Sequence, residues 1–97
     1  MTENSGSAVA HDQERSRFSI DVDGEPAVAD YTQEGDTIML THTVVPRSAR
    51  GQGIGDELAK AAFEYARSND LKVVPVCPFM RTFADRHDEY TDLLKRT

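Results

Sequence analysis

Residues 44–55 read VVPRSARGQGIG, a stretch that joins an apolar strand to an amphipathic helix through glycines at positions 51, 53 and 55. Glycine lacks a Cβ atom, so a ligand can approach the backbone closely at these positions. The free N–H groups that open a helix favour anionic oxygen atoms. Arg50 adds a permanent positive charge suited to bidentate contact with phosphate. The stretch therefore predicts a phosphate-binding turn, and a glycine-rich turn without a ligand is the alternative.

The spacing of the glycines distinguishes between the known phosphate-binding loops. A Walker loop needs a Gly-Lys pair, and none occurs in the chain. The dinucleotide fingerprint Gly-x-Gly-x-x-Gly fails because Asp56 stands at its third glycine. The pattern that remains is Arg50-x-x-Gly53-x-Gly55, which resembles the pyrophosphate motif of the GNAT superfamily of acyl-coenzyme A dependent N-acyltransferases.

The resemblance extends from Arg17 to the end of the chain, and the sequence looks like a small single-domain, acetyltransferase-like family within that superfamily. It runs through the Asp23-Gly24 hairpin, residues 40–46, the glycine loop and residues 73–79, where Cys77 lies between two prolines. Larger members of the superfamily carry a helical pair after the first strand and a closing C-terminal hairpin, and this sequence shows neither. Because those parts shape the acceptor pocket, the resemblance implies coenzyme binding more firmly than any particular acceptor.

Periodicity predicts one α/β (α+β) domain over residues 17–97, preceded by a disordered leader over residues 1–16. Three antiparallel strands are expected over residues 18–22, 25–31 and 38–45, the last with Ile38, Leu40, His42 and Val44 on one face. A helix over 55–68 and a strand over 71–76 complete a β-α-β unit around the glycine loop, with the two strands parallel. The apolar stripe predicted for this helix consists of Ile54, Leu58, Ala61, Ala62 and Tyr65. A second helix over 79–87 and a closing segment over 90–94 follow. The resemblance implies that this is a minimal GNAT-like fold.

The bulk composition excludes several function classes. The net charge of −6 and the pI near 4.9 argue against nucleic acid as a partner, since a nucleic-acid binder needs a basic face. An acidic surface suits a cationic amine better. The single cysteine cannot form an internal disulfide, and no apolar run is long enough for a membrane span. A cytoplasmic protein without a metal site is the default expectation.

The resemblance implies where acetyl-coenzyme A, as co-substrate, would lie. Its pantetheine arm is expected between residues 42–45 and 73–77, hydrogen-bonded to the main chain of Val44 and Val45. Its pyrophosphate is expected on Arg50 and the backbone of the loop residues that follow, which are Gly51, Gln52, Gly53, Ile54 and Gly55. The thioester would then end near Cys77.

Two mechanisms of acyl transfer fit these residues. In direct transfer, His42 is the best-placed base for the acceptor amine. In the covalent route, Cys77 attacks first and the amine then resolves an acyl-cysteine. Tyr90 is the candidate donor to the leaving thiolate, as a tyrosine is in many superfamily members. Each has a structural alternative: a buried cysteine, a core histidine, and a tyrosine packed against Leu94.

The leading hypothesis is an acetyl-coenzyme A dependent N-acetyltransferase whose acceptor is a small or protein amine. Its acceptor site is open or is completed by another chain, as in a homodimer. The alternative is a coenzyme A or acyl-coenzyme A binding module without turnover, and a third interpretation is a plain interaction domain.

Overall fold

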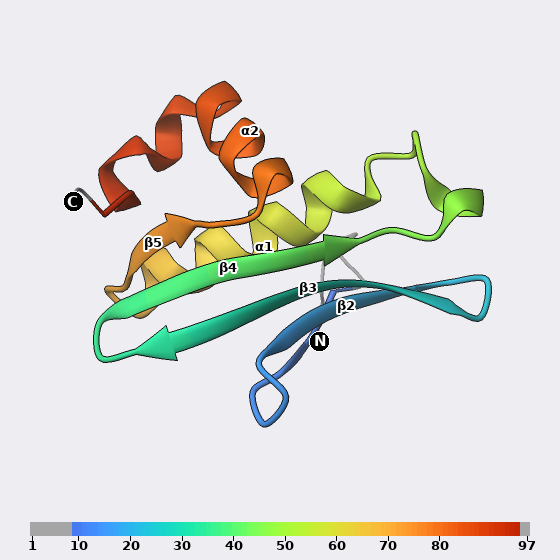
Figure 1. Ribbon diagram of the computed structural model, residues 1–97, viewed down its shortest axis with the longest axis horizontal. Coiled ribbons are helices and arrows are strands. Elements are labelled where there is room, and N and C mark those ends of the chain that lie inside the picture. Colours follow the sequence, from blue (N-terminus) through green and yellow to red (C-terminus); the bar gives the residue numbers. More distant parts are fainter. Residues whose placement is uncertain (1–8, 96–97) are drawn as a thin grey trace.

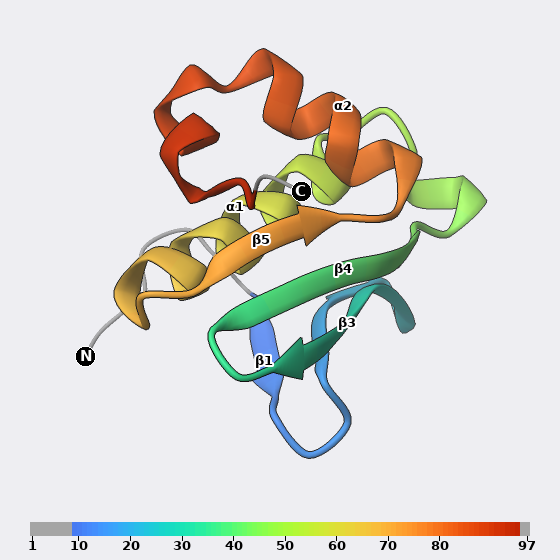
Figure 2. The same cartoon turned by 60° about the vertical axis from the view of Figure 1, so that its left-hand side comes forward.

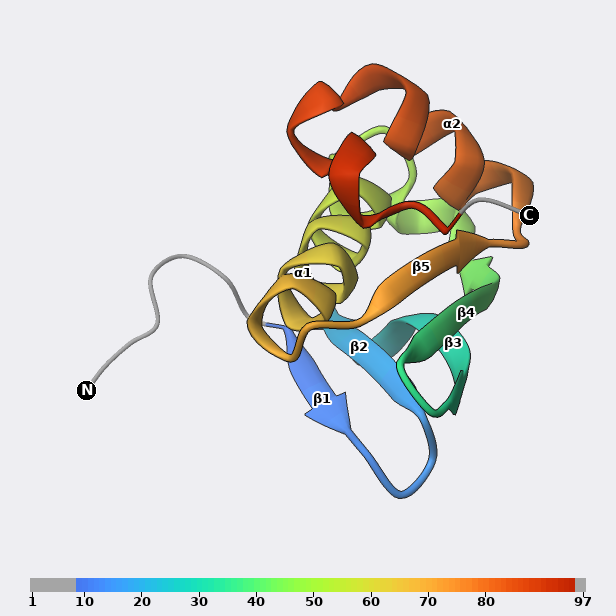
Figure 3. The same ribbon diagram turned by 90° about the vertical axis from the view of Figure 1, so that its left-hand side faces the viewer.

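The computed structural model describes residues 9–95, which form a five-stranded sheet in the order β1-β2-β3-β4-β5 (Figure 1). The strands are β1 (Ala10–Asp12), β2 (Arg17–Val22), β3 (Glu25–Glu34), β4 (Thr37–Val44) and β5 (Lys72–Pro75). The helical segments are η1 (Arg47–Ala49), α1 (Ile54–Ser68), α2 (Pro78–Arg86) and η2 (Asp88–Leu93). Helix α1 packs across one face of the sheet, and α2 and η2 lie beside it over the β4–β5 end (Figure 3). The expected mixed α/β fold is confirmed.

The N-terminal leader departs from the prediction. Residues 10–12 form strand β1, which pairs antiparallel with β2 along Ala10↔Ser19 to Asp12↔Arg17. The prediction of disorder is therefore wrong for residues 10–16, and residues 1–8 lie outside the described part. The physical reason is tertiary: the imidazole of His11 stacks on Phe18 at 4.1 Å between ring centroids. His11 also contacts residues far along the chain, with its Nε2 2.6 Å from the hydroxyl of Tyr31 and its ring 4.5 Å from that of Tyr65. These contacts order a segment that lacks local apolar periodicity.

The first hairpin matches its sequence signal. Asp23 and Gly24 form the turn between β2 and β3, with φ angles of 52° and 88°. A two-residue hairpin of this kind requires positive φ at both positions, which Asp-Gly accepts at low cost. The expected strand pairing on either side is present from Arg17↔Asp30 to Val22↔Glu25.

Strand β4 contains a bulge that reverses its faces. Tyr31 pairs with Leu40 whereas Asp30 pairs with His42, so Thr41 is an extra residue on β4. A bulge of this kind shifts the alternation of side chains by one position. Beyond it Thr43 lies opposite the buried Ala29 and faces the helices, while His42 lies opposite Asp30 on the outer face. The predicted face shared by Ile38, Leu40, His42 and Val44 is therefore wrong after Leu40.

Strands β4 and β5 are parallel, as predicted, and they diverge. Their pairing runs only from Thr37↔Lys72 to Leu40↔Pro75, and the last link is the hydrogen bond from Cys77 N to Leu40 O at 2.9 Å. Strand β4 then continues to Val44 while the chain after β5 turns into α2 (Figure 2). The edge of β4 that faces β5 is thus unpaired beyond Leu40.

Helix α1 contributes five buried apolar side chains to the core. Its buried side chains include Ala59, Phe63 and Ala66 in addition to the predicted Leu58 and Ala62. The predicted Ile54, Ala61 and Tyr65 are only partly buried. The helical segments α2 and η2 also pack on α1, and the ring of Phe63 contacts Phe83 and Tyr90 there. Within residues 9–95, no helix is long and apolar enough to cross a membrane.

Candidate functional site

A cavity of about 410 Å³ opens at the N-terminus of α1. It lies where β4 has left β5, between the glycine loop and the first turn of α2. Its lining comes from β4, the loop, α1 and α2: Thr43, Val45, Ala49, Arg50, Gly51, Gly53, Ile54, Gly55, Asp56 and Phe79. The sequence-predicted loop and the free end of β4 therefore face one common space.

The backbone of the loop presents donors to this cavity. Gly51 and Gly53 have φ angles of 84° and 77°, a region that other residues enter only with strain. A Cβ atom at either position would meet no protein atom within 4 Å. Within the described residues, no intramolecular backbone hydrogen bond uses an N–H group of residues 51–56. These free donors at the start of α1 fit anionic oxygen atoms.

Gly55 is needed for a different reason. It lies in the first turn of α1 and is buried against the ring of Phe79. A Cβ atom there would stand 2.7 Å from Phe79 Cζ. The missing side chain thus lets the first turns of α1 and α2 approach each other at the cavity wall.

Two charged side chains of opposite sign line the cavity. Arg50 Nε donates to the carbonyl of Val45 at 3.2 Å, which ties the guanidinium to the end of β4. Asp56, in the first turn of α1, places an exposed carboxylate beside the free N–H groups. The carboxylate interacts favourably with the helix dipole, but it repels an anion bound at the same place. Among the lining residues, Arg50 therefore supplies the positive charge that offsets the negative charge of Asp56.

The inner end of the cavity adjoins a cysteine and threonine pair. Cys77 immediately precedes α2 and is 9% exposed, and its Sγ lies 3.6 Å from Thr43 Oγ1. Burial raises the pKa of the Cys77 thiol, but hydrogen bonding by Thr43 and by backbone N–H groups of α2 outweighs burial and lowers the pKa below its ordinary value. The arrangement raises the fraction of thiolate, the nucleophilic form of cysteine, relative to an ordinary cysteine.

The predicted cofactor-binding residues fall into two groups. Val45, Arg50, Gly51, Gly53, Ile54 and Gly55 line the cavity. Val44 lies outside it on the outer face of the sheet, 56% exposed, because the bulge at Thr41 reverses its direction. Gln52 also lies outside the lining, and its side-chain amide donates to Ser48 O at 3.4 Å within the loop.

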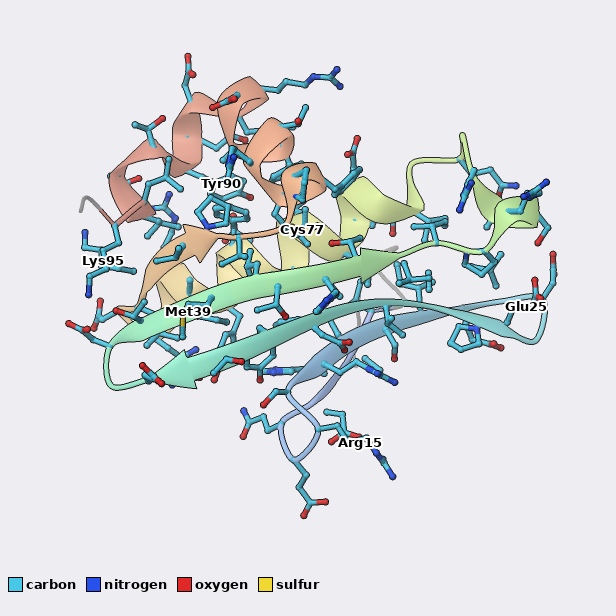
Figure 4. The ribbon with its side chains drawn as sticks, in the orientation of Figure 1. Arg15, Glu25, Met39, Cys77, Tyr90 and Lys95 are labelled. Carbon is cyan, nitrogen blue, oxygen red and sulfur yellow. The ribbon has the colours of Figure 1, made fainter. Side chains whose placement is uncertain are left out.

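The three predicted catalytic residues are not brought together. Cys77 lies at the junction of β5 and α2, whereas Tyr90 lies farther along, in η2 (Figure 4). Tyr90 is 2% exposed, donates its hydroxyl to Glu64 Oε2 at 2.7 Å, and its pKa is raised by burial and by that carboxylate. His42 is exposed on the opposite face of β4 from Cys77. The structure thus assembles Cys77 with Thr43 and places the other two elsewhere.

Sequence reasoning missed four residues of the lining: Thr43, Ala49, Asp56 and Phe79. Asp56 follows the motif directly, but the motif itself assigns it no role. The sequence places Phe79 only at the start of the predicted helix over residues 79–87, and Ala49 is buried in the turn η1, which has no clear sequence signal. Thr43 could not have been found, because nothing local predicts the bulge that turns it inward.

Comparison with known proteins gives concordant results. A family model described as GCN5-related N-acetyl-transferase matches residues 17–93. The chain is 37% identical over 86 residues to Protein NATD1 of Xenopus tropicalis, an alignment that covers 86% of this chain and 79% of that protein. It is 38% identical over 78 residues to Protein NATD1 of Mus musculus, covering 77% of this chain and 71% of that protein.

A solved structure supports the same relationship. The NMR solution structure of a GCN5-like protein from Staphylococcus aureus superposes with a TM-score of 0.74 and 29% sequence identity. The match covers 97% of this chain and 93% of that chain, so it includes the sheet, the glycine loop and the C-terminal helices.

Proposed function

Because the chain belongs to the GCN5-related N-acetyltransferase family, we propose that it transfers an acetyl group from acetyl-coenzyme A to an amine. The observation that carries the proposal is the continuous cavity that runs from the free N–H groups of the glycine loop to Thr43, next to Cys77. The anion site at one end of the cavity suits the diphosphate of an acyl-coenzyme A. The nucleophile beside the other end suits its thioester.

The loop is the proposed binding site for the diphosphate. The N–H groups of residues 51–56 would donate to its oxygen atoms, and the Nη atoms of Arg50 would add charge-assisted bonds. Gly51 and Gly53, both with positive φ, line the cavity at this point. A side chain at either glycine would both strain the backbone and occupy the space.

The unpaired edge of β4 is the proposed binding site for the pantetheine arm. Beyond Leu40 the strand loses its neighbour β5, so its main-chain groups on that side are free for an extended ligand. Val45 and Phe79 supply apolar contact on either side of this path. An arm that follows the edge from the loop toward Leu40 passes Thr43 and reaches Cys77.

The covalent route is the chemistry that this geometry favours. The Cys77 thiolate attacks the thioester carbonyl carbon, the bond to the coenzyme sulfur breaks, and the coenzyme leaves as a thiolate that takes up a proton. The amine then attacks the acetyl-cysteine, loses a proton, and returns Cys77 as the thiolate. Backbone N–H groups at the start of α2 would stabilise the charge that develops at each step.

Direct transfer is the second route. It needs an amine in the gap between β4 and β5 and a base on the side from which the amine arrives. His42 is exposed on the outer face beside this gap, so it would serve an amine that approaches from outside the sheet. The two routes thus use opposite faces of β4.

A module that binds coenzyme A without turnover is the alternative function. Strand β1 is joined to β2 by residues 13–16, and β2 to β3 by the two-residue turn at Asp23-Gly24, so neither connection contains a helical pair. No wall of an acceptor pocket is therefore supplied at this point of the sheet. Under the leading proposal the acceptor is a small or protein amine. It binds in an open site, or a second copy of the chain completes that site.

Ligand-induced stabilisation tests both functions. Acetyl-coenzyme A at a hundred times its dissociation constant adds about 2.7 kcal/mol, which raises the Tm by on the order of 10 °C for so small a domain. Gly53→Val should abolish the shift. Gly35→Val is the matched control, because Gly35 also has positive φ, 57°, but lies in the β3–β4 turn away from the cavity. An equal shift in Gly53→Val would contradict both functions.

Turnover separates the enzyme from the module. We expect release of free coenzyme thiol above the hydrolytic background with at least one member of a panel of amines and peptides. Arg50→Ala should lose this activity, whereas Arg15→Ala, in the distant β1–β2 turn, should keep it. Binding without release for every amine would favour the module.

Intact mass spectrometry separates the two routes. An acetyl adduct that forms on wild type and is missing in Cys77→Ala supports the covalent route. Turnover that survives Cys77→Ala and is lost in His42→Ala supports direct transfer.

A further inference from the structure

Thr43 is the one side chain that hydrogen-bonds the Cys77 thiol among the described residues. It faces the thiol because the bulge at Thr41 reverses the alternation of β4, and it would point to the outer face in a regular strand. Its neighbour across the sheet is Ala29, which has no polar side-chain atom to compete for the hydroxyl. The bulge therefore aims the Thr43 hydroxyl at Cys77.

The thiol is held in place from its own side as well. Cys77 N donates to Leu40 O at 2.9 Å, and this bond anchors Cys77 to β4 at the residue just before the bulge. Pro78 follows at the first position of α2, where its ring restricts φ and the missing N–H removes no helical bond. Sγ and Oγ1 are thus carried by two backbone segments that are hydrogen-bonded to each other.

The Thr43 hydroxyl can form a hydrogen bond with the thiol and with the thiolate of Cys77. It accepts a hydrogen bond from the thiol and, after rotation, donates one to the thiolate. The groups that act on Cys77 ionisation are burial, Thr43 and the backbone N–H groups of Phe79 and Met80, and no charged side chain is among them. From β4, then, Thr43 is the polar side chain that faces the sulfur, and α2 contributes only backbone.

We propose that Thr43 is a positioning residue that orients Cys77 Sγ toward the cavity and stabilises its thiolate. The role of Thr43 in acyl transfer rests on the proposed function. The state of the thiol itself is independent of that function, because it can be measured without coenzyme.

The test is the pH dependence of Cys77 alkylation by iodoacetamide, measured on the full chain. Thr43→Val keeps the branched shape and removes the hydroxyl, so the midpoint of the profile should rise by about one pH unit, the equivalent of one hydrogen bond. Thr43→Ser restores the hydroxyl and should return the midpoint to within a few tenths of a unit of wild type. Thr32→Val, at an exposed threonine of β3, is the matched control and should leave the midpoint unchanged.

The outcomes separate this inference from the proposed function. A wild-type midpoint in folded Thr43→Val overturns the inference, whatever the protein does with acetyl-coenzyme A. A raised midpoint that Thr43→Ser does not reverse also overturns it, because packing would then be the cause. If Thr43→Val does not fold, Thr43→Ala makes the same comparison with Thr43→Ser. A raised midpoint in a protein that never forms an acetyl adduct supports the inference and removes the covalent route.

Discussion

The ring of Phe79 lies on the Cα of Gly55, so that a Cβ atom built on that glycine would stand 2.7 Å from Phe79 Cζ. This contact joins the first turns of α1 and α2 at the wall of the cavity. Two effects of opposite sign therefore compete when Gly55 is replaced by alanine. Alanine favours the helix by about 1 kcal/mol, and the clash with the ring opposes it.

We predict that Gly55→Ala stabilises the protein only when Phe79 is also shortened. In Phe79→Ala the substitution should raise the free energy of unfolding by up to about 1 kcal/mol, since only helix propensity remains. In wild type the gain should be cancelled or reversed. Urea denaturation of the four proteins of this double-mutant cycle measures the coupling. Equal effects of Gly55→Ala in both backgrounds would show that the ring moves aside freely.

Asp56 should weaken the binding of anionic ligands while it supports α1. Its carboxylate lies beside the free N–H groups of the helix start, where it competes with a bound anion. Asp56→Asn should tighten coenzyme A binding about two- to five-fold, the effect of one charge at a helix end. Calorimetry at low and high salt checks this, since added salt should shrink the difference. Glu57→Gln, in the same helical turn but outside the cavity lining, should have the smaller effect.

His11 should make the stability of the protein depend on pH. Burial lowers its pKa in the folded state, against a weaker opposing effect of Asp12, and its Nε2 lies 2.6 Å from the hydroxyl of Tyr31. The unfolded chain binds a proton more readily, so this contribution is present above about pH 6.5 and is lost as the pH falls. Chemical denaturation from pH 5 to 8 should therefore show a slope that His11→Phe reduces. His42→Asn, at an exposed histidine, should keep the slope, and a loss of slope in both variants would assign it to net charge.

Tyr90 should contribute to stability and leave turnover intact. Its hydroxyl donates to Glu64 from a buried ring that packs on Phe63. Tyr90→Phe keeps the ring and removes the bond, which should cost about 1 kcal/mol and lower the Tm by about 4–8 °C. Release of coenzyme thiol at a temperature well below the Tm should be unchanged. A lost activity in folded Tyr90→Phe would restore the role predicted from the sequence.

Local chemistry explains why much of this fold could be predicted. The Asp23-Gly24 turn accepts positive φ, and Pro46 follows the end of β4. Gly53, without a Cβ, begins α1 in the left-handed region. Each of these signals acts within a few residues, and signals of this kind predict strands β2 to β5, both α-helices and the glycine loop.

The elements that were missed depend on contacts between distant residues. Strand β1 is held by contacts of His11 with Tyr31 and Tyr65. The apolar face of α1 is widened by η2, which follows it by some twenty residues. Periodicity within one segment carries no information about either contact.

The sequence by itself determined that a glycine loop links a strand to a helix, and it predicts that this loop suits a phosphate, because backbone conformation at glycine and charge at arginine are local properties. Only the tertiary structure decided which side chains face that loop. One extra residue at Thr41, created by the pairing of β4 with β3, directs Thr43 to Cys77 and His42 to the opposite face. Register belongs to the pair of strands, so neither strand's sequence alone contains it.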